Sequence, residues 1–189
     1  DWKQTAKKNK LMTKEFERKQ KRNVHIMLNT AVDETVNDQS FEAAIELAYA
    51  FTNSRQINDG KQFYSSIGVQ THSFDVSNDV SSQEELLYHF VYLQPTNERL
   101  SSLNSRLQNQ VNQMTYLILI TTQLNKPFQH LLLDFYKRTK QIIVIYVTST
   151  NDKAPINKEM LVLFKENQIK LLKISERNWK GNVIEVKAS

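Results

Sequence analysis

The fold is decided by residues 114–147, whose sequence reads MTYLILITTQLNKPFQHLLLDFYKRTKQIIVIYV. Residues 114–121 are almost continuously apolar, which is typical of a strand that is buried on both faces. Pro127 suits the first turn of a helix, and we expect this helix to run to about Thr139. Residues 142–147 form the clearest predicted strand of the chain. A strand, a helix and a second buried strand in this order indicate an α/β fold with parallel strands.

The same alternation continues in both directions along the chain. We expect further strands at residues 24–29, 67–74 and 169–174, and further helices at residues 40–54, 81–94, 98–112 and 157–167. Ser40 is expected to cap the first helix, and residues 81–84 match the capping-box pattern before the second. The tail after residue 175 could hold a short strand at 183–186. The predicted fold is a three-layer, doubly wound, mostly parallel sheet covered by helices.

Length and composition exclude several classes of protein. The chain has 189 residues, enough for one domain with a tail, and it has no cysteine, which excludes disulfides and thiolate metal sites. Its three glycines lie far apart, so the glycine-rich loops that bind phosphates and dinucleotides are not encoded. The longest apolar runs are far shorter than the ~20 residues of a membrane-spanning helix. Because the chain begins with Asp1, we expect it to be a piece of a longer protein.

The positive charge of the chain is confined to its N-terminal segment, residues 1–22. This segment holds nine Lys or Arg against three acids, a balance of +6, whereas the whole chain carries +5 and the remainder sums to −1. A neutral body is not typical of a nucleic-acid-binding domain. Residues 1–22 could be a solvated arm, a segment near the anionic cytoplasmic face of a membrane, or an edge strand around residues 11–16. The sequence leaves these three interpretations open.

A ligand site in such a sheet is expected where the parallel strands end. The predicted strand ends are residues 29–34, 121–124 and 148–152, which are rich in hydroxyls and amides but poor in carboxylates and histidines. We expect packing or surface roles for all four histidines, which are His25, His72, His89 and His130. The nearest acidic cluster is Asp33, Glu34 and Asp38. It is either a solvated loop or a site for a hard cation such as Mg²⁺.

Residues 1–17, DWKQTAKKNKLMTKEFE, resemble the signature segment of the bacterial domain-of-unknown-function 58 family. The resemblance implies a von Willebrand factor A-like fold, which agrees with the alternation described above. It also implies membrane-spanning segments before this region, with the chain on the cytoplasmic side of the bacterial cell membrane. A MoxR-type AAA+ ATPase is the implied partner. The implied divisions are a basic arm at 1–22, a von Willebrand factor A-like domain at 23–175 and a tail at 176–189.

The resemblance also implies where a metal site would lie. Proteins of the wider fold often bind a divalent cation through an Asp-x-Ser-x-Ser loop, a later Thr and a later Asp. In this chain the corresponding positions are Asn29, Ala31, Asp33, Thr96 (or its neighbour Asn97) and Thr122. Two carboxylates and one hydroxyl are therefore missing from a site that must offset the dehydration of Mg²⁺. We expect a degenerate site without a tightly bound metal, although Asp33 could support weak binding.

These patterns favour a protein without catalytic activity and without a cofactor. The leading hypothesis is an interaction or adaptor module that is anchored to the membrane in its full-length form and docks on the ATPase. The alternative is a Mg-dependent phosphoesterase or nuclease that uses Asp33, Glu34 and Asp38. A third hypothesis is nucleic-acid binding through residues 3–22, which would depend steeply on salt concentration.

Overall fold

Seven strands form one mixed sheet in the computed structural model of the chain, which describes residues 22–33, 36–54, 60–76, 79–96, 105–149, 156–176 and 184–185. The strand order is β3-β2-β1-β4-β5-β6-β7. The strands are β1 (Asn23–Asn29), β2 (Gln62–Ile67), β3 (Thr71–Asp75), β4 (Thr115–Thr121), β5 (Ile142–Thr148), β6 (Lys170–Ser175) and β7 (Ile184–Glu185). The outermost strands β3 and β7 run antiparallel to their neighbours, and the five strands between them are parallel.

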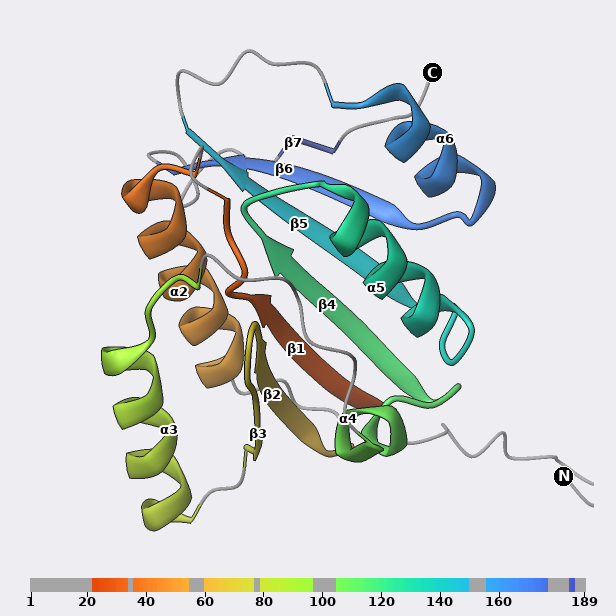
Figure 1. The fold of residues 1–189 in the computed structure, drawn as a ribbon. Coiled ribbons are helices and arrows are strands. Elements are labelled where there is room, and N and C mark those ends of the chain that lie inside the picture. The colour runs from red at the N-terminus through yellow and green to blue at the C-terminus, as the bar shows by residue number, and fades with distance from the viewer. Residues whose placement is uncertain are drawn as a thin grey trace, which may run out of the picture.

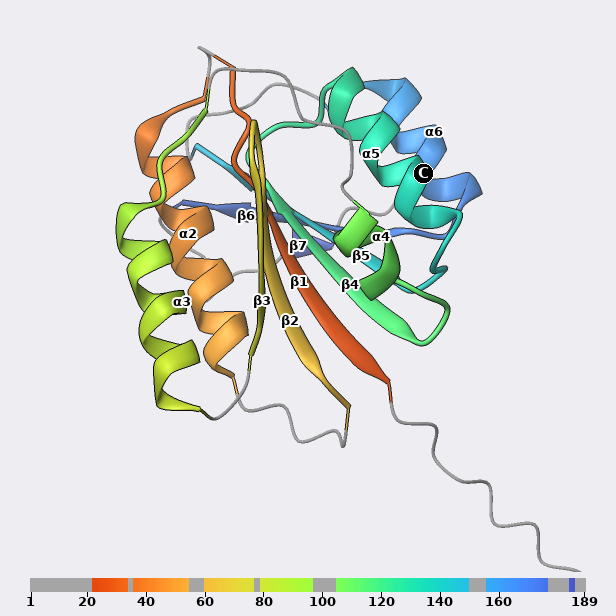
Figure 2. The same ribbon diagram turned by 60° about the horizontal axis from the view of Figure 1, so that its bottom comes forward.

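Helices cover both faces of this sheet (Figures 1 and 2). The helices are α2 (Asp38–Asn53), α3 (Val80–Tyr92), α4 (Ser105–Gln110), α5 (Lys126–Tyr136) and α6 (Lys158–Glu166). Figure 2 shows α2 and α3 side by side on one face, with α4, α5 and α6 on the other. The predicted three-layer, doubly wound α/β fold of the von Willebrand factor A-like type is confirmed.

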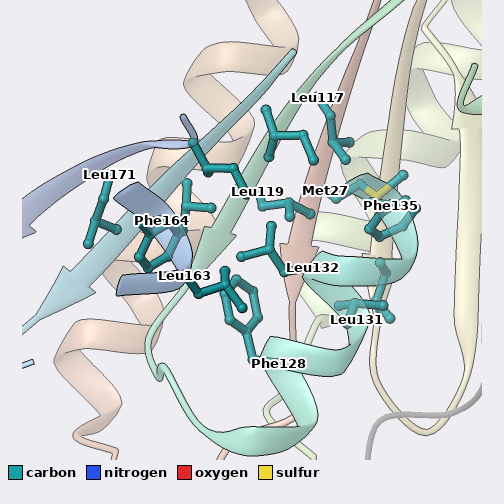
Figure 3. Close-up of a cluster of buried hydrophobic side chains, with 14 of the residues drawn as sticks. Met27, Leu117, Leu119, Phe128, Leu131, Leu132, Phe135, Leu163, Phe164 and Leu171 are labelled. Atoms are coloured by element: carbon teal, nitrogen blue, oxygen red, sulfur yellow. The ribbon is translucent and has the colours of Figure 1, made fainter. Parts of the chain in front are cut away.

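Each face of the sheet has its own hydrophobic core. The core under α5 and α6 includes Phe128, Leu132, Phe135 and Phe164, which pack on Met27 and on apolar residues of β4 (Figure 3). The core under α2 and α3 includes Ile26, Leu28, Tyr64 and Phe90. Side chains alternate along β1, so that Met27 lies in one core and its neighbours Ile26 and Leu28 lie in the other. This double burial explains why the strands are continuous apolar runs in the sequence.

The predicted helix caps both lie too late in the chain, because a better cap precedes each one. The side chain of Asn37 accepts a hydrogen bond from Gln39 N and caps α2, whereas Ser40 lies inside the helix and donates to Glu176 Oε2 at 3.0 Å. Asp79 caps α3 by accepting a hydrogen bond from Ser82 N at 3.3 Å. Asn and Asp are at least as effective as Ser at this position, so the earlier residue begins the helix.

The strand predicted at residues 67–74 combines the last residue of β2, a turn and most of β3. Its first residue, Ile67, ends β2, and β3 begins at Thr71 after the turn at residues 68–70. Strand β2 escaped prediction because its sequence QFYSSI holds two serines, Ser65 and Ser66, that are nevertheless buried. Of the helix predicted at 98–112, Ser105–Gln110 is helical and residues 111–112 are not, whereas residues 98–104 lie outside the described ones. The short strand in the tail is confirmed as β7.

Within the described ranges, none of the helices combines the length and the apolar character that crossing a bilayer requires. The proposed basic arm and its edge strand around residues 11–16 lie outside the described residues, apart from Arg22. The guanidinium of Arg22 stacks over the ring of Tyr116 at 5.1 Å, where it also donates to Gln141 Oε1 at 3.0 Å.

Candidate functional site

The chain reverses its direction across the sheet between β1 and β4. Strand β1 lies between β2 on one side and β4 on the other, and both run parallel to it. In open α/β sheets the crevice at the carboxyl ends of two such strands is the usual ligand site. Asn29 ends β1 and Thr121 ends β4, so these two residues define this edge, which we call the crest.

Asn29 holds the crest together through both atoms of its side-chain amide. Its Nδ2 donates to Thr121 Oγ1 at 3.0 Å, and its Oδ1 accepts from Ala31 N at 3.1 Å. Only 4% of Asn29 is exposed. The oxygen of Asn29 is therefore already used by the backbone of its own loop, and the nitrogen is a donor, which cannot bind a cation.

Gln123 completes the same network from the β4 side. Its Oε1 accepts from Asp33 N at 3.1 Å, and its Nε2 donates to Ala31 O. Thr121 Oγ1 in turn donates to Gln123 O at 2.8 Å. The sequence marked residues 121–124 as a strand end but assigned Gln123 no role. The only signal for it was an amide two positions after Thr121, and its partners lie far away, in the loop after β1.

Thr96 reaches the crest from the chain segment after α3. Its N donates to Thr30 O at 2.9 Å, its Oγ1 donates to the same oxygen at 3.2 Å, and its own carbonyl accepts from Val32 N at 2.9 Å. Gly68 packs against both threonines: a Cβ at this position would lie 2.3 Å from Thr30 Oγ1 and 2.8 Å from Thr96 Oγ1. The turn after β2 therefore requires a residue without a side chain.

The remaining predicted site residues are not brought together as a charged cluster. Asp33 is exposed beside the crest, and Asp38 begins α2 and is exposed. Glu34 and Asn97 lie outside the described residues. Thr122 is 7% exposed, and its Oγ1 has no hydrogen-bond partner in the described part of the chain. No group of three or more His, Cys, Asp or Glu side chains with metal-binding geometry occurs within the described ranges.

The donors at the crest do not fit a tightly held divalent cation. Mg²⁺ needs several oxygen ligands, among which carboxylates offset most of the cost of losing water. Here the oxygen of Asn29 is engaged by Ala31 N, Ala31 has no side-chain oxygen, and the Thr96 hydroxyl donates to Thr30 O. Asp33 adjoins this network through its backbone N, which donates to Gln123 Oε1, and its side chain is exposed.

His25 lies within the sheet and away from any solvent-facing site. Its Nε2 lies 2.8 Å from Ser65 Oγ on the neighbouring strand, and its ring packs against Phe63. Complete burial lowers the pKa of His25 to about 3, so the imidazole is neutral at physiological pH. The prediction of a packing role for His25 agrees with this environment.

A pocket of about 620 Å³ adjoins the crest on the α3 side, and we call it the α3 pocket. None of its lining residues carries a carboxylate, ammonium or guanidinium group. The lining residues are Thr30, Ser66, Val69, Gln70, His72, His89, Tyr92, Leu93, Gln94, Pro95 and Thr96. The ring centroids of His72 and His89 are 5.2 Å apart. Burial, with a smaller contribution from His72, lowers the pKa of His89 to about 4.

The α3 pocket was not foreseen, because its two histidines come from different elements. His72 lies on β3, and His89 lies on α3. His89 Nε2 is buried and has no hydrogen-bond partner among the described residues. The pocket therefore offers a neutral lining, and its volume falls in the range of roughly 300–1,000 Å³ that is typical of ligand sites.

Comparison with known proteins supports the resemblance seen in residues 1–17. No curated protein matches this chain. The family described as "Protein of unknown function DUF58" matches residues 1–176, which include the crest, the α3 pocket and every parallel strand. Since this match covers nearly the whole sequence, the chain belongs to the DUF58 family.

Proposed function

We propose that the protein is a non-catalytic protein-interaction or adaptor module with a degenerate metal-ion site. In its full-length form it is anchored at the cytoplasmic side of the bacterial cell membrane, and its partner is a MoxR-type AAA+ ATPase. The observation that carries the proposal is the network of Asn29, Thr121 and Gln123, which engages the polar groups of the crest with one another. Membership of the DUF58 family supports the choice of partner.

The chemistry of the crest argues for docking rather than turnover. A hydrolase of this architecture needs an activated nucleophile, or a cation that activates water, at the strand ends. The side chains that meet there are amides and hydroxyls, and each of Asn29, Thr121 and Gln123 is held by at least two hydrogen bonds. Because Asn29, Thr121 and Gln123 are buried, they fix the loops at the crest, and a partner would contact the exposed groups that these loops carry.

The direct test is a binding assay between the full-length protein and the MoxR-type ATPase of the same bacterium. We expect the two proteins to co-purify and the ATPase rate to change when the complex forms. A variant in which the crest network is broken, Gln123→Ala, should weaken the complex if the crest is part of the contact. Absence of binding by the full-length protein would contradict the proposal.

A calorimetric titration with Mg²⁺, Mn²⁺ and Ca²⁺ tests the competing enzyme hypothesis. We expect no binding tighter than millimolar, because Asp33 alone supplies too little negative charge. Tighter binding that is lost in Asp33→Ala would favour the Mg-dependent phosphoesterase or nuclease instead. Asp75→Ala is the matched control, since Asp75 is an exposed acid on β3 that does not belong to this acidic cluster.

A further inference from the structure

Helix α3 carries most of the large apolar side chains that the described structure leaves in solvent. Nine such residues are exposed, and five of them are on this one helix: Val80, Leu87, Tyr88, Val91 and Tyr92. Tyr88 is 65% exposed and Tyr92 is 73% exposed, and their rings stack in parallel at 6.3 Å. Single exposed apolar residues need no explanation, whereas a contiguous group on one helix marks an interaction site.

The exposed residues form a second apolar face on α3. Leu86 and Phe90 face the sheet and are buried in the core, as expected for a covering helix. Leu87 and Val91 are one turn apart on a different side, and Tyr88 and Tyr92 follow them at the same spacing. Figure 1 shows α3 at the periphery beside α2, so none of the described helices lies over this second face, which we call the outer face of α3.

The charges around the outer face are all negative. No Lys or Arg occurs between Lys61 and Arg99, a stretch that includes β2, β3, α3 and the segment leading to Thr96. The same stretch contains five acids, which are Asp75, Asp79, Glu84, Glu85 and Glu98. Glu84 and Glu85 are exposed and lie less than one turn before Leu87 and Tyr88. A partner that buries the apolar stripe must therefore bring positive charge to these carboxylates.

The α3 pocket continues this surface at the carboxyl end of the helix. Tyr92 belongs both to the outer face and to the pocket lining, and Val69, which is also exposed, is a second residue of that lining. Because no charged side chain lines the pocket and His89 is neutral at physiological pH, it would receive an uncharged side chain. An aromatic side chain meets this requirement, because it buries a large apolar area in a neutral site.

We propose that the outer face of α3 binds a basic amphipathic helix of a protein partner, which places an aromatic side chain in the α3 pocket. The inference rests on the proposed function, an interaction module, and it specifies the surface and the chemistry of the bound segment. The apolar face of the partner helix covers Leu87, Tyr88, Val91 and Tyr92, and its Lys or Arg side chains approach Glu84 and Glu85. This is the helix-in-groove mode of recognition, anchored by one aromatic residue.

A lipid bilayer is the less favourable occupant of this face. Helices that lie on membranes carry Lys and Arg on their polar side, because the cytoplasmic leaflet is anionic. The polar residues beside the stripe of α3 include Glu84 and Glu85 and no Lys or Arg, so an anionic surface would repel it. Vesicle binding is therefore one of the outcomes that the experiment must separate.

The test is an NMR titration of the whole chain with two short helical peptides. Both have Leu and one Trp on the apolar side, and the polar side is Lys in one and Glu in the other. We expect the Lys peptide to shift the resonances of α3, of Val69 and of His72, with at least tenfold weaker binding in high salt. The Glu peptide should not bind. Equal binding of both peptides, or shifts located away from α3, would overturn the proposal.

Variants with matched controls locate the contact. Tyr88→Ala with Tyr92→Ala should weaken binding of the Lys peptide at least tenfold, and Glu84→Lys should weaken it severalfold. The controls are Val162→Ser and Glu166→Lys, which remove an exposed apolar residue and reverse an exposed charge on α6, on the opposite face of the sheet. Their binding should equal that of the wild type. Equal losses in the controls would show non-specific adsorption and would overturn the proposal.

Three other outcomes would identify a different occupant. Binding to vesicles of anionic lipid that is lost in Tyr88→Ala with Tyr92→Ala would identify a membrane surface. Concentration-dependent dimerisation lost in the same variant would identify a second copy, and α3 shifts upon deletion of residues 1–21 would identify the chain's own arm. Each of these results would overturn the proposal. Failure of the proposed function alone would give a different result, in which the Lys peptide binds α3 but the ATPase does not bind the protein.

Discussion

The two faces of the sheet are covered by helices that differ in packing and in charge. Helix α5 buries four of its 11 residues, Phe128, Leu131, Leu132 and Phe135, whereas α3 buries only Leu86 and Phe90 of its 13. Helices α2 and α3 hold five acids and no Lys or Arg. Helices α5 and α6, with the turn at residues 137–140, hold six bases against three acids.

The contrast extends to the polar groups at the ends of the strands. Asn29 and Thr121 follow Met27 and Leu119 in the alternation of their strands, so they point to the α5 side, where they bond each other. Ser66 follows Tyr64 in the same way and points to the α3 side, where it lines the pocket. The α5 side is therefore closed, whereas on the other side α2 is well buried and α3 keeps surface available for a partner.

The largest expected effect tests the closed face. Phe135 is fully buried in the core under α5, so Phe135→Ala should lower the free energy of unfolding by about 3–5 kcal/mol. The matched substitution on the open face is Leu87→Ala, which should cost less than about 1 kcal/mol because Leu87 is half exposed. Urea denaturation followed by circular dichroism measures both values. Similar losses would show that α3 contributes to the core as much as α5 does.

The next effect compares two adjacent threonines at the crest. Thr121 Oγ1 bonds Asn29 Nδ2, Gln123 O and Gln123 N, so Thr121→Val should cost about 1–3 kcal/mol by leaving these groups unpaired. Thr122→Val removes a buried hydroxyl without a partner in the described structure, and it should be neutral or stabilising by about 1 kcal/mol. The same denaturation assay applies. A marked loss of stability in Thr122→Val would show that this hydroxyl has a bound partner.

A smaller effect comes from the two neutral histidines, His25 within the sheet and His89 on α3. The pKa of His25 is lowered to about 3 and that of His89 to about 4, both from 6.5. Below pH 6.5 the unfolded chain takes up protons that the folded chain does not, so stability is complete above this pH and falls as the pH decreases. Each histidine contributes at most about 1.4 kcal/mol per pH unit within its window.

Replacement of each histidine separates the two contributions. We expect both His25→Gln and His89→Gln to flatten the dependence of unfolding free energy on pH between about 6.5 and 4.5. Below about pH 4 only His25→Gln should flatten it further, because the window of His25 extends to about pH 3. Urea denaturation at a series of pH values gives the slopes. A wild-type slope in His25→Gln would mean that the folded protein can protonate this residue.

The smallest expected effect concerns the outer face of α3 itself. Tyr92→Ala should change the free energy of unfolding by no more than about 0.5 kcal/mol, since the side chain is 73% exposed. Thermal unfolding monitored by circular dichroism is sufficient to measure this. A loss as large as that expected for Thr121→Val would show that Tyr92 supports the fold and would weaken the distinction between the two faces.

The sequence predicted the order of the elements well because the parallel strands are buried on both faces. Residues such as Ile142 and Val144 are apolar for that reason alone, and a single sequence displays it. Strand β2 was not predicted because Ser65 interrupts its apolar run. Ser65 is buried as the hydrogen-bond partner of His25 on the neighbouring strand, and no local sequence pattern reveals such a pairing between distant parts of the chain. The helix starts were displaced because Asn37 and Asp79 compete with the serines that follow them.

The sequence was sufficient to predict several residues of the candidate site, but not the hydrogen bonds between them. Aligning the chain with the metal-binding pattern identified Asn29, Ala31 and Thr96, and the structure brings these residues to one crest. The role of Gln123 depends on its distance from Ala31 and Asp33, which only the folded sheet determines. The α3 pocket likewise exists because the turn at Gly68 brings β3, and with it His72, alongside α3.

The segregation of charge between the two helical layers makes the described part of the molecule an electric dipole. Such a body does not approach other charged surfaces in random orientations, because long-range forces rotate it before any contact forms. Close to an anionic bilayer, the α5 and α6 side would turn toward the lipid and α3 would point toward the aqueous phase. At low ionic strength, encounters with a partner in the aqueous phase would then begin at α3, the helix with the most exposed large apolar residues.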